Sequence, residues 1–426
     1  MYENSTLYHQ LLKEHTKEEV DSIFESELQK RGITDYVDFV KNYKREYTEE
    51  NIVKYVDLVS YLQLDIQNEL SDYLLKYILN QQYLDLICNY HCIRYNIEEY
   101  CKYKNKLFDK DLLYISSYVD IIELNLSENN HITDRGLKNC YYIQYLNAYN
   151  SKNITTCEPF AKSLIKLEAN GDYCGIKDKG LNNCTNIQIL NTNYNKRISR
   201  CDSFAENLIE LEAVFTSGMN DTGLENCINL KILDATDNDK ITTCDPFSHS
   251  IIKLKVAVEQ IAIGNNFGID DKGLRNCNKL EFLDASNNIK ITTCEPFANS
   301  LEELIAFHKC GIDDKGLEKC INLKILDAYA NTNITTCAPF AHSLIILNAS
   351  GNCGIGDKGL ENCINLQMLN IYNNSKITTC KPFANTLIKL DVSGLYCNIS
   401  DKELINCKKL TQLYSHQNSK ITIKIE

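Results

Sequence analysis

Cysteine is the side chain of this sequence with the widest chemistry, and the spacing of its twenty copies limits what they can do. Zinc and thiol-redox sites need cysteines in close pairs such as Cys-x-x-Cys, and the sequence contains none. Cys88, Cys92 and Cys101 lie near the N-terminus, whereas the other seventeen recur at fixed places of a repeated motif. A cysteine that returns in each repeat is typical of a small apolar filler in a narrow core. We therefore predict neither a metal site nor a cofactor.

Catalytic groupings are also missing from the sequence pattern. His91 lies between Cys88 and Cys92, and a Cys–His pair can form a nucleophile when a third group orients the histidine. Residues 88–92 supply no acid for that role. The glycine-rich stretch at residues 351–356 lacks the Lys-Ser or Lys-Thr ending of a phosphate-binding loop. The sequence therefore predicts a protein that is not an enzyme.

Two phrases repeat from about residue 119 onward and define the elements that carry these side chains. Successive copies are 43 or 44 residues apart, except for one step of 50. Gly-Leu-x-x-Cys or a close variant ends at Cys140, Cys184, Cys227, Cys277, Cys320, Cys363 and Cys407, and Cys-x-Pro-Phe or a variant begins at Cys157, Cys201, Cys244, Cys294, Cys337 and Cys380. A fixed period of this size predicts a stacked array, in which each repeat buries its apolar face against its neighbours.

Each period contains two leucine-rich repeats. Residues 323–334 read Leu-x-x-Leu-x-Ala-x-x-Asn-x-x-Ile, and the next repeat carries the same phrase with Cys353 near the Asn position. We expect Leu326 and Ala328 to point inward from a short strand while the alternate residues line a concave sheet. Asn331 or Cys353 then packs against the backbone of the following turn. The predicted fold is an α/β leucine-rich repeat solenoid, a horseshoe of about fourteen repeats.

Polar residues and prolines fit the ends of short helical turns on the convex side. Asp314 and Thr336 precede such turns and can cap them. All five prolines occupy the Cys-x-Pro-Phe slot, near the first helical position, where the missing N–H costs nothing. We therefore assign the prolines a structural role.

Glycine and proline mark a domain boundary near residue 115. Residues 1–115 contain one glycine, Gly32, and no proline. Apolar residues such as Ile52, Val56 and Val59 recur there at helical spacing. We predict a helical N-terminal domain over residues 1–115, which caps the open end of a leucine-rich repeat domain over residues 116–426.

The charge and hydropathy of the chain exclude several kinds of partner. The formal net charge is −12, which leaves no basic footprint for a nucleic acid. No apolar run approaches the thickness of a bilayer, and the first residues do not resemble a signal peptide. We expect an intracellular protein of the reducing cytoplasm, with the nucleus as an alternative compartment and no contact with membranes.

The outward position after the second leucine of each repeat forms a negatively charged stripe. Its acids are Glu168, Glu212, Asp234, Asp284, Asp327 and Asp391, and five asparagines share the same position. The flanking aromatic residues are Tyr145, Tyr149, Phe282, Phe307, Tyr329 and Tyr372. Acids and aromatic anchors together suit a target protein with a basic peptide or an arginine-rich patch. The alternative interpretation is that these Asp and Asn side chains only form hydrogen bonds between neighbouring strands.

One repeat is longer than the rest. Between Leu254 and Ile269 the chain has seven residues more than the equivalent stretch from Leu304 to Ile312. Insertions in repeat proteins map to one face and often bind partners. We expect a loop near residues 256–264, either for binding or as a neutral insertion.

The repeated phrase resembles a known family. Residues 131–140, His-Ile-Thr-Asp-Arg-Gly-Leu-Lys-Asn-Cys, are similar to the cysteine-containing leucine-rich repeats of F-box/LRR proteins. Members of that family are substrate receptors of cullin-based ubiquitin ligases. The resemblance covers about the last three quarters of the chain, which departs from the family in its strict two-repeat alternation and its Cys-x-Pro-Phe half.

Three interpretations of the N-terminal region stay open. Residues 47–65 resemble the C-terminal half of a BTB/POZ domain, residues 70–79 resemble the opening of an F-box, and a plain capping bundle explains both. Either resemblance implies docking to a cullin or a cullin adaptor through Tyr61, Leu62, Leu64, Leu70, Leu74, Leu75 and Ile78. The functional hypothesis is a ligase adaptor that binds its target on the concave sheet, and the alternative is an interaction scaffold without a ligase.

Overall fold

The computed structural model describes residues 107–117, 120–259 and 268–423. The chain divides into two compact units, Met1–Leu164 and Ile165–Glu426, which are termed the N-terminal and C-terminal units. The predicted helical domain over residues 1–115 lies outside the described residues except for its last segment, so it stays a prediction. Among the helices in the described ranges, none has the length and apolar content needed to cross a lipid bilayer.

The described part of the N-terminal unit contains the first repeats. Its elements are α8 (Asp109–Ile115), β1 (Glu123–Asn125), β2 (Tyr145–Asn147) and the 3-10 turn η1 (Glu158–Phe160), and β1 pairs with β2 in parallel. The Asp109 carboxylate on α8 accepts hydrogen bonds from the N–H (2.8 Å) and the hydroxyl (2.7 Å) of Thr133. This Asp–Thr contact returns in the periods of the C-terminal unit, so α8 makes a contact of the kind that joins repeats.

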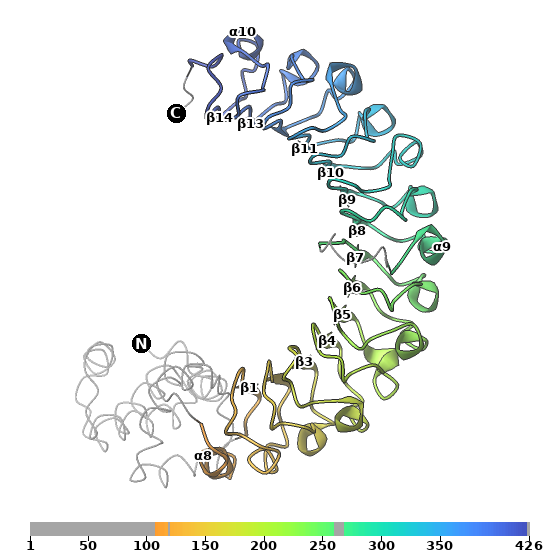
Figure 1. Ribbon diagram of the computed structural model, residues 1–426, viewed down its shortest axis with the longest axis vertical. Coiled ribbons are helices and arrows are strands. Elements are labelled where there is room, and N and C mark those ends of the chain that lie inside the picture. The colour runs from red at the N-terminus through yellow and green to blue at the C-terminus, as the bar shows by residue number, and fades with distance from the viewer. Residues whose placement is uncertain (1–106, 118–119, 260–267, 424–426) are drawn as a thin grey trace, which may run out of the picture. The chain divides into compact units, whose positions relative to one another are not determined.

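Twelve short parallel strands form the sheet of the C-terminal unit. Consecutive strands pair in register, so each central leucine lies beside the central leucine of the next strand. The strands of this unit follow the inner side of an arc (Figure 1). They are β3 (Lys166–Glu168), β4 (Ile189–Asn191), β5 (Glu210–Glu212), β6 (Ile232–Asp234), β7 (Lys253–Lys255), β8 (Phe282–Asp284), β9 (Glu303–Ile305), β10 (Ile325–Asp327), β11 (Ile346–Asn348), β12 (Met368–Asn370), β13 (Lys389–Asp391) and β14 (Gln412–Tyr414).

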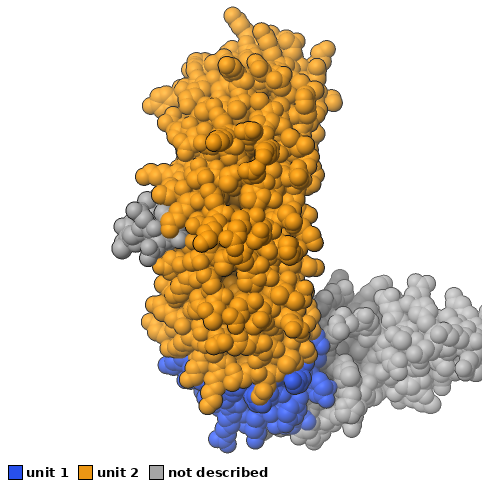
Figure 2. All heavy atoms as spheres, turned by 90° about the vertical axis from the view of Figure 1, so that its right-hand side faces the viewer, with its two compact units in different colours: residues 1–164 blue, residues 165–426 orange. Residues whose placement is uncertain are grey.

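Short helical turns occupy the outer side of the arc, where the unit presents a continuous column of packed side chains (Figure 2, orange). Most are single 3-10 turns, a form that suits connectors of three or four residues. They are η2 (Asp178–Leu181), η3 (Ala205–Asn207), η4 (Thr222–Leu224), η5 (Asp245–Phe247), α9 (Asp271–Leu274), η6 (Glu295–Phe297), η7 (Ala338–Phe340), η8 (Asp357–Leu360), η9 (Lys381–Phe383) and α10 (Asp401–Leu404). The geometry is that of a leucine-rich repeat solenoid, as predicted.

The core of the C-terminal unit runs as parallel ladders of identical side chains. Leu326 and Ala328 are fully buried, which confirms the predicted inward positions. The phenylalanine of each Cys-x-Pro-Phe phrase is also buried, at Phe204, Phe247, Phe297, Phe340 and Phe383. Burial of a phenylalanine side chain contributes on the order of 2 kcal/mol. Each repeat therefore brings its own share of a core that only its neighbours can complete.

The turn after each strand is held by a buried polar side chain or by a cysteine. Asn331 donates a hydrogen bond from Nδ2 to the carbonyl of Ala306 (2.9 Å) and accepts one at Oδ1 from the N–H of Asn333 (2.8 Å). Cys353 occupies the equivalent turn of the next repeat and is also buried. Both residues thus lie where the sequence placed them. Six asparagines of the C-terminal unit donate to a neighbouring repeat in this way, namely Asn195, Asn238, Asn288, Asn331, Asn374 and Asn418.

The predicted positions of proline and Thr336 at the start of the helical turns are confirmed, whereas the predicted capping role of Asp314 is wrong. Proline lies at the start of the Cys-x-Pro-Phe turns, and the hydroxyl of Thr336 accepts the N–H of Ala338 (3.1 Å). Asp314 does not cap the turn that it begins. Its carboxylate reaches the next repeat instead, where it accepts the N–H (2.7 Å) and hydroxyl (2.5 Å) of Thr335. Asp313, one residue earlier, accepts the N–H of Gly316 (2.9 Å) and takes the predicted capping role.

Candidate protein-binding surface

The concave face of the C-terminal unit consists of the first and third residues of each strand. From β3 to β13 the central leucine is buried, while the residues on either side of it are at least partly exposed. All six predicted acids occupy third positions, namely Glu168, Glu212, Asp234, Asp284, Asp327 and Asp391. Phe282 occupies the first position of β8, and Phe307, Tyr329 and Tyr372 lie two residues beyond β9, β10 and β12.

The remaining predicted positions belong to the N-terminal unit or lie outside the described residues. Tyr145 begins β2 and Tyr149 follows it, so both belong to the N-terminal unit. Residues 260–264 of the predicted insertion loop lie outside the described residues. The same holds for all candidates for ligase docking, Tyr61, Leu62, Leu64, Leu70, Leu74, Leu75 and Ile78.

Aspartate and asparagine at the third position share a local structural role. Asp234, Asp284 and Asp327 each accept, at Oδ1, the backbone N–H two residues later, at 3.0–3.1 Å. The asparagines at this position do the same, as Asn370 does with Tyr372 (3.0 Å). Such Asx turns are a usual reason for Asp and Asn at the end of a strand. The alternative interpretation from the sequence is therefore partly right, although most of these bonds run along the chain and not between strands.

The residue that follows this turn adopts a left-handed backbone in nearly every repeat. In the C-terminal unit the positive φ occurs three residues after every strand except β7, at Gly171, Tyr194, Phe215, Asp237, Asn287, His308, Ala330, Gly351, Asn373, Gly394 and Gln417. Most are not glycine, so the sequence did not signal this position. Val258 occupies it after β7 and has no positive φ. A β-branched residue disfavours that backbone conformation, and this is the repeat that carries the insertion.

The first five strands of the C-terminal unit form a charged segment. We define it by the outward residues of β3–β7, which are Lys166, Glu168, Ile189, Asn191, Glu210, Glu212, Ile232, Asp234, Lys253 and Lys255. Charges of both signs meet within it, because Lys166 Nζ lies 3.2 Å from Glu168 and Lys255 Nζ lies 3.4 Å from Asp234. Glu212 accepts hydrogen bonds from Asn191 (2.7 Å) and Asn193 (2.9 Å). The segment thus satisfies much of its own charge.

The next five strands form an apolar segment. We define it by the outward residues of β8–β12, which are Phe282, Asp284, Glu303, Ile305, Ile325, Asp327, Ile346, Asn348, Met368 and Asn370. Five of the ten are apolar, three are acids and none is basic. Ile325, Ile346 and Met368 lie side by side on consecutive paired strands. Apolar side chains gathered on an exposed sheet face are characteristic of an interaction surface.

Aromatic rings border the apolar segment. Phe307 and Tyr329 lie edge to face with ring centroids 6.1 Å apart, and His308 packs against Tyr329 at 4.9 Å. Aromatic side chains offer large contact area at a low cost in conformational entropy, which is why they anchor many interfaces. These rings therefore extend the apolar segment beyond the strands.

Two acids of the concave face, Asp327 and Glu212, have pKa values raised above those of exposed acids. Burial raises the pKa of Asp327, and the charge of Asp284 raises it further. Burial likewise raises the pKa of Glu212, with added contributions from Glu168 and Asp234. Hydrogen bonds from Asn348 to Asp327 and from Asn193 to Glu212 act in the opposite direction. Like charges on this face therefore repel one another, and a cation placed among them would be stabilised.

Two hollows open on the described part of the face. One hollow of about 280 Å³ opens where the two segments meet, with Glu212, Ile232, Phe282 and Glu303 in its wall. A second, of about 310 Å³, lies toward β14 and is lined in part by Met368, Asp391 and Tyr414, against which Lys389 Nζ packs at 5.5 Å from the ring centroid. Shallow hollows of this size can accept single side chains of a partner.

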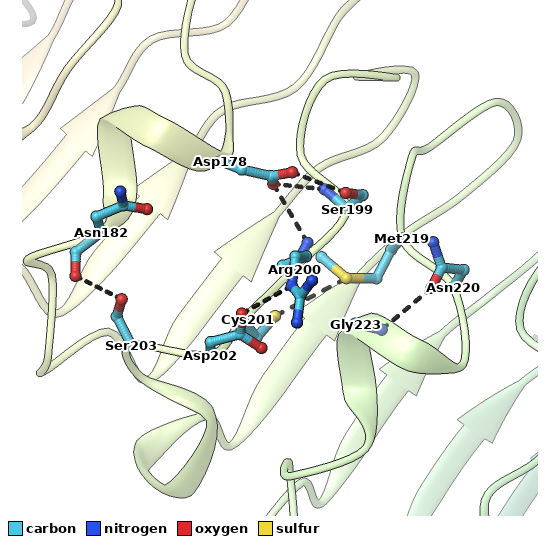
Figure 3. A network of polar contacts seen from close by, with 10 residues as sticks. All are labelled: Asp178, Asn182, Ser199, Arg200, Cys201, Asp202, Ser203, Met219, Asn220 and Gly223. Atoms are coloured by element: carbon cyan, nitrogen blue, oxygen red, sulfur yellow. Dashed lines mark hydrogen bonds and ion pairs between the residues drawn. The ribbon is translucent and has the colours of Figure 1, made fainter.

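Sequence reasoning missed the polar ladder that joins neighbouring repeats on the outer side. Figure 3 shows one copy, in which the Asp178 carboxylate accepts the N–H (2.7 Å) and hydroxyl (2.7 Å) of Ser199 and the N–H of Arg200 (3.2 Å). Arg200 in turn forms an ion pair with Asp202 (2.7 Å). The signal was present in the sequence, because an Asp-Lys-Gly-Leu phrase precedes a Thr-Thr or Ser-Arg pair at a constant separation of 21 residues.

The described cysteines belong to the core of the repeats. All seventeen that are described are buried and unbridged, which agrees with their predicted role as core filler. Burial raises the pKa of Cys310 to about 12 and that of Cys353 to about 11. The neighbouring thiol of Cys320, together with burial, raises the pKa of Cys294. These thiols stay protonated at neutral pH. Within the residues that the structure describes, no group of His, Cys, Asp and Glu is arranged to hold a metal ion.

Comparisons with known proteins find likeness in structure and none in sequence. The chain matches no protein-family model and no curated protein. An internalin, InlF, of Listeria monocytogenes shares 20% identity at a TM-score of 0.45, over 74% of this chain and 85% of that one. A leucine-rich repeat protein of Leptospira interrogans shares 17% at 0.49, over 81% and 94%. The yeast Rad7–Elc1 complex contains a chain that shares 14% at 0.39, over 90% and 97%.

Proposed function

We propose that the concave face of the C-terminal unit binds a target protein and that the chain is a substrate-recognition adaptor of a cullin-type ubiquitin ligase. The observation that carries the first part is the apolar segment. Ile325, Ile346 and Met368 form a row of partly exposed apolar side chains on adjoining strands, next to the rings of Phe307 and Tyr329. A row of this kind gains stability when a partner covers it.

A comparison between copies of the repeat supports the same face. The central strand residue is leucine from β3 to β14, and buried asparagines return at one turn position in six repeats. The third strand position, in contrast, holds Glu, Asn, Asp, Lys, Ile or Tyr. Positions that repeat are those that packing dictates, and positions that vary are free to serve a specific partner.

The ligase part of the proposal depends on the resemblance of residues 131–140 to F-box/LRR repeats and on the docking candidates between Tyr61 and Ile78. In that scheme the N-terminal region binds a cullin component while the concave face holds the target. The second candidate function is an interaction scaffold without a ligase, and the concave face favours it equally, since target binding is common to both.

Affinity capture with the full chain and two variants tests the proposal. The first variant replaces Ile325, Ile346 and Met368 with serine. The second deletes residues 1–100, which keeps the hydrogen bonds from Asn129 to Leu107 and from Thr133 to Asp109. We expect the triple variant to lose the target but to keep a cullin or its adaptor, and the deletion to do the reverse.

Each outcome separates the two functions. If the deletion loses no partner and the full chain captures no cullin component, the scaffold is correct and the ligase proposal is wrong. If the triple variant keeps every partner, the concave face is not the binding surface. A matched control replaces three exposed outer isoleucines, Ile228, Ile321 and Ile364, with serine, and it should keep all partners.

A further inference from the structure

The two segments of the concave face differ in whether their acids meet a base of the same protein. In the charged segment, Asp234 has Lys255 at 3.4 Å and Glu168 has Lys166 at 3.2 Å. Lys255 lies between Asp234 and Asp284 in the strand register, and its ammonium turns toward Asp234. No outward residue of β8–β12 is basic. The apolar segment therefore carries negative charge that its own side chains leave uncompensated.

The acids of the apolar segment surround one apolar residue. In the register of β8, β9 and β10, Ile305 lies between Asp284 and Asp327, and Glu303 precedes it on the same strand. Neighbouring strands are about 4.8 Å apart, so the two aspartates are about 10 Å apart with Ile305 between them. That separation admits one long basic side chain, whose methylene stem would pack on Ile305 while its charged end lies between the two carboxylates.

Both carboxylates retain capacity to accept further hydrogen bonds. Asp284 uses Oδ1 for the N–H (3.0 Å) and hydroxyl (2.6 Å) of Ser286, and the described contacts leave its Oδ2 without a donor. Asp327 accepts Tyr329 N–H at Oδ1 (3.1 Å) and Asn348 Nδ2 at Oδ2 (3.0 Å), one bond per oxygen. Each carboxylate oxygen can accept two hydrogen bonds. Charge-assisted bonds from a guanidinium or ammonium are therefore geometrically available.

We infer that the apolar segment seats a protein segment in which an arginine or lysine is followed, three or four residues later, by a large apolar side chain. This inference rests on the proposed binding function of the same face. The basic group lies over Ile305 between Asp284 and Asp327, and the apolar group lies on Ile346 and Met368. The strands β11 and β12 are two and three strands beyond β9, roughly 10 to 14 Å away, which an extended chain of about 3.3 Å per residue spans in three to four residues.

Four matched peptides and three proteins test the inference by fluorescence polarisation. The lead peptide carries an arginine and a pair of leucines three and four residues later, on a Gly-Ser background. The comparison peptides replace the arginine with glutamine, replace the leucines with serine, or move the leucines next to the arginine. The proteins are the full-length chain, the double variant Asp284→Asn/Asp327→Asn, and the control variant Glu361→Gln, which changes an exposed acid just after η8.

Asparagine preserves the fold at these positions, because Asn348 and Asn370 already form the same turn on β11 and β12. We expect the lead peptide to bind the natural chain about tenfold more tightly than the glutamine peptide, with a preference that weakens as salt increases. The double variant should bind both peptides alike, whereas Glu361→Gln, which removes an acid away from the strands, should keep the preference.

Equal binding of the arginine and glutamine peptides to the natural chain would overturn the inference, as would a preference that survives in the double variant. Equal binding of the lead peptide and of the peptide with leucines next to the arginine would show that the proposed spacing is wrong. Failure of the lead peptide to bind at millimolar concentration would overturn it as a whole. The proposed function would still stand after any of these results, provided that the triple variant of Ile325, Ile346 and Met368 loses a target protein that the full chain captures.

Discussion

The turn edge and the concave face of the C-terminal unit are built from the same repeats but follow opposite rules. At the turns, one solution is copied from each two-repeat period to the next. Asn331 donates to Ala306 just as Asn374 donates to Ala349, 43 residues further on. On the concave face the outward residues differ from strand to strand, and the local hydrogen bond of an Asp or Asn constrains only its Oδ1 atom.

The difference shows which residues hold the solenoid and which are free for a partner. A buried amide that satisfies several backbone groups cannot vary, because each group left unsatisfied costs stability. An outward apolar residue of a strand has no such obligation. The concave face can therefore collect side chains that add little to folding, such as the row from Ile325 to Met368, and their presence calls for a different explanation.

The sharpest test of this difference uses two adjacent residues of β10. Leu326 is fully buried, so Leu326→Ala should lower the free energy of unfolding by about 4 kcal/mol, through lost transfer energy and the cavity left behind. Ile325→Ala changes the outward neighbour and should cost about 1 kcal/mol or less. Denaturant titration followed by circular dichroism measures both. Equal losses would mean that Ile325 belongs to the core.

The same substitution at two asparagines gives the next largest contrast. Asn331→Ala removes the bond to the carbonyl of Ala306 and leaves the N–H groups of Asn333 and Ile334 without an acceptor. We expect a loss of about 3 kcal/mol, on the order of 1 kcal/mol for each group. Asn370→Ala, on the concave face, removes one turn bond and should cost about 1 kcal/mol. Thermal unfolding of the two variants in the same buffer measures both losses. A larger loss in Asn370→Ala than in Asn331→Ala would contradict the assignment of Asn331 to the structural turn and of Asn370 to the concave face.

A smaller contrast separates two aspartates. Asp314→Ala breaks the bonds to Thr335 and Thr336 that join neighbouring repeats, and we expect a loss of about 1 kcal/mol because the site is partly exposed. Asp327→Asn keeps the Oδ1 acceptor for Tyr329 and should change stability by less than about 0.5 kcal/mol at pH 7. Hydrogen exchange at the amides of Thr335 and Thr336 should quicken in the first variant only. Faster exchange there in Asp327→Asn would refute the division of roles.

The smallest expected effect is a dependence on pH. Burial and the charge of Asp284 raise the pKa of Asp327 above its value in the unfolded chain. The folded protein then binds the proton more readily, so the contribution of Asp327 to stability improves as pH falls through the folded pKa. Measured against Asp327→Asn, the natural chain should gain stability between pH 7 and pH 4. A relative loss over that range would show that the pKa is lowered.

The fold could be predicted from the sequence because the residues that pack the core recur at a fixed period. Leucine, cysteine and phenylalanine return every 43 or 44 residues, and that period reports the inward positions directly. The left-handed residue after each strand was not predictable, since Tyr194, Phe215 and His308 occupy it as readily as Gly351 does. Asp314 was misplaced because its carboxylate serves the next repeat, a contact that local capping rules do not consider.

The candidate surface was predicted as a negatively charged stripe of acids and asparagines flanked by aromatic residues, and the structure divides it into two segments. Strand register shows that Lys255 lies beside Asp234 and that Ile305 separates Asp284 from Asp327. The contrast between a compensated segment and an uncompensated one depends on these neighbours across strands. Chain order lists the same neighbours, but it does not show that consecutive strands pair in register or that the Lys255 ammonium turns toward Asp234.

Photo-crosslinking from single positions of the full-length chain tests most directly whether a partner occupies the concave face. A benzophenone amino acid replaces Ile346, in the middle of the apolar segment, or Ile364, which is 50% exposed on a Gly-Leu-x-x-Cys turn. We predict that irradiation in native lysate yields a discrete crosslinked protein from position 346 and none from position 364. A crosslink from 364 alone, or the same product from both positions, would contradict the account.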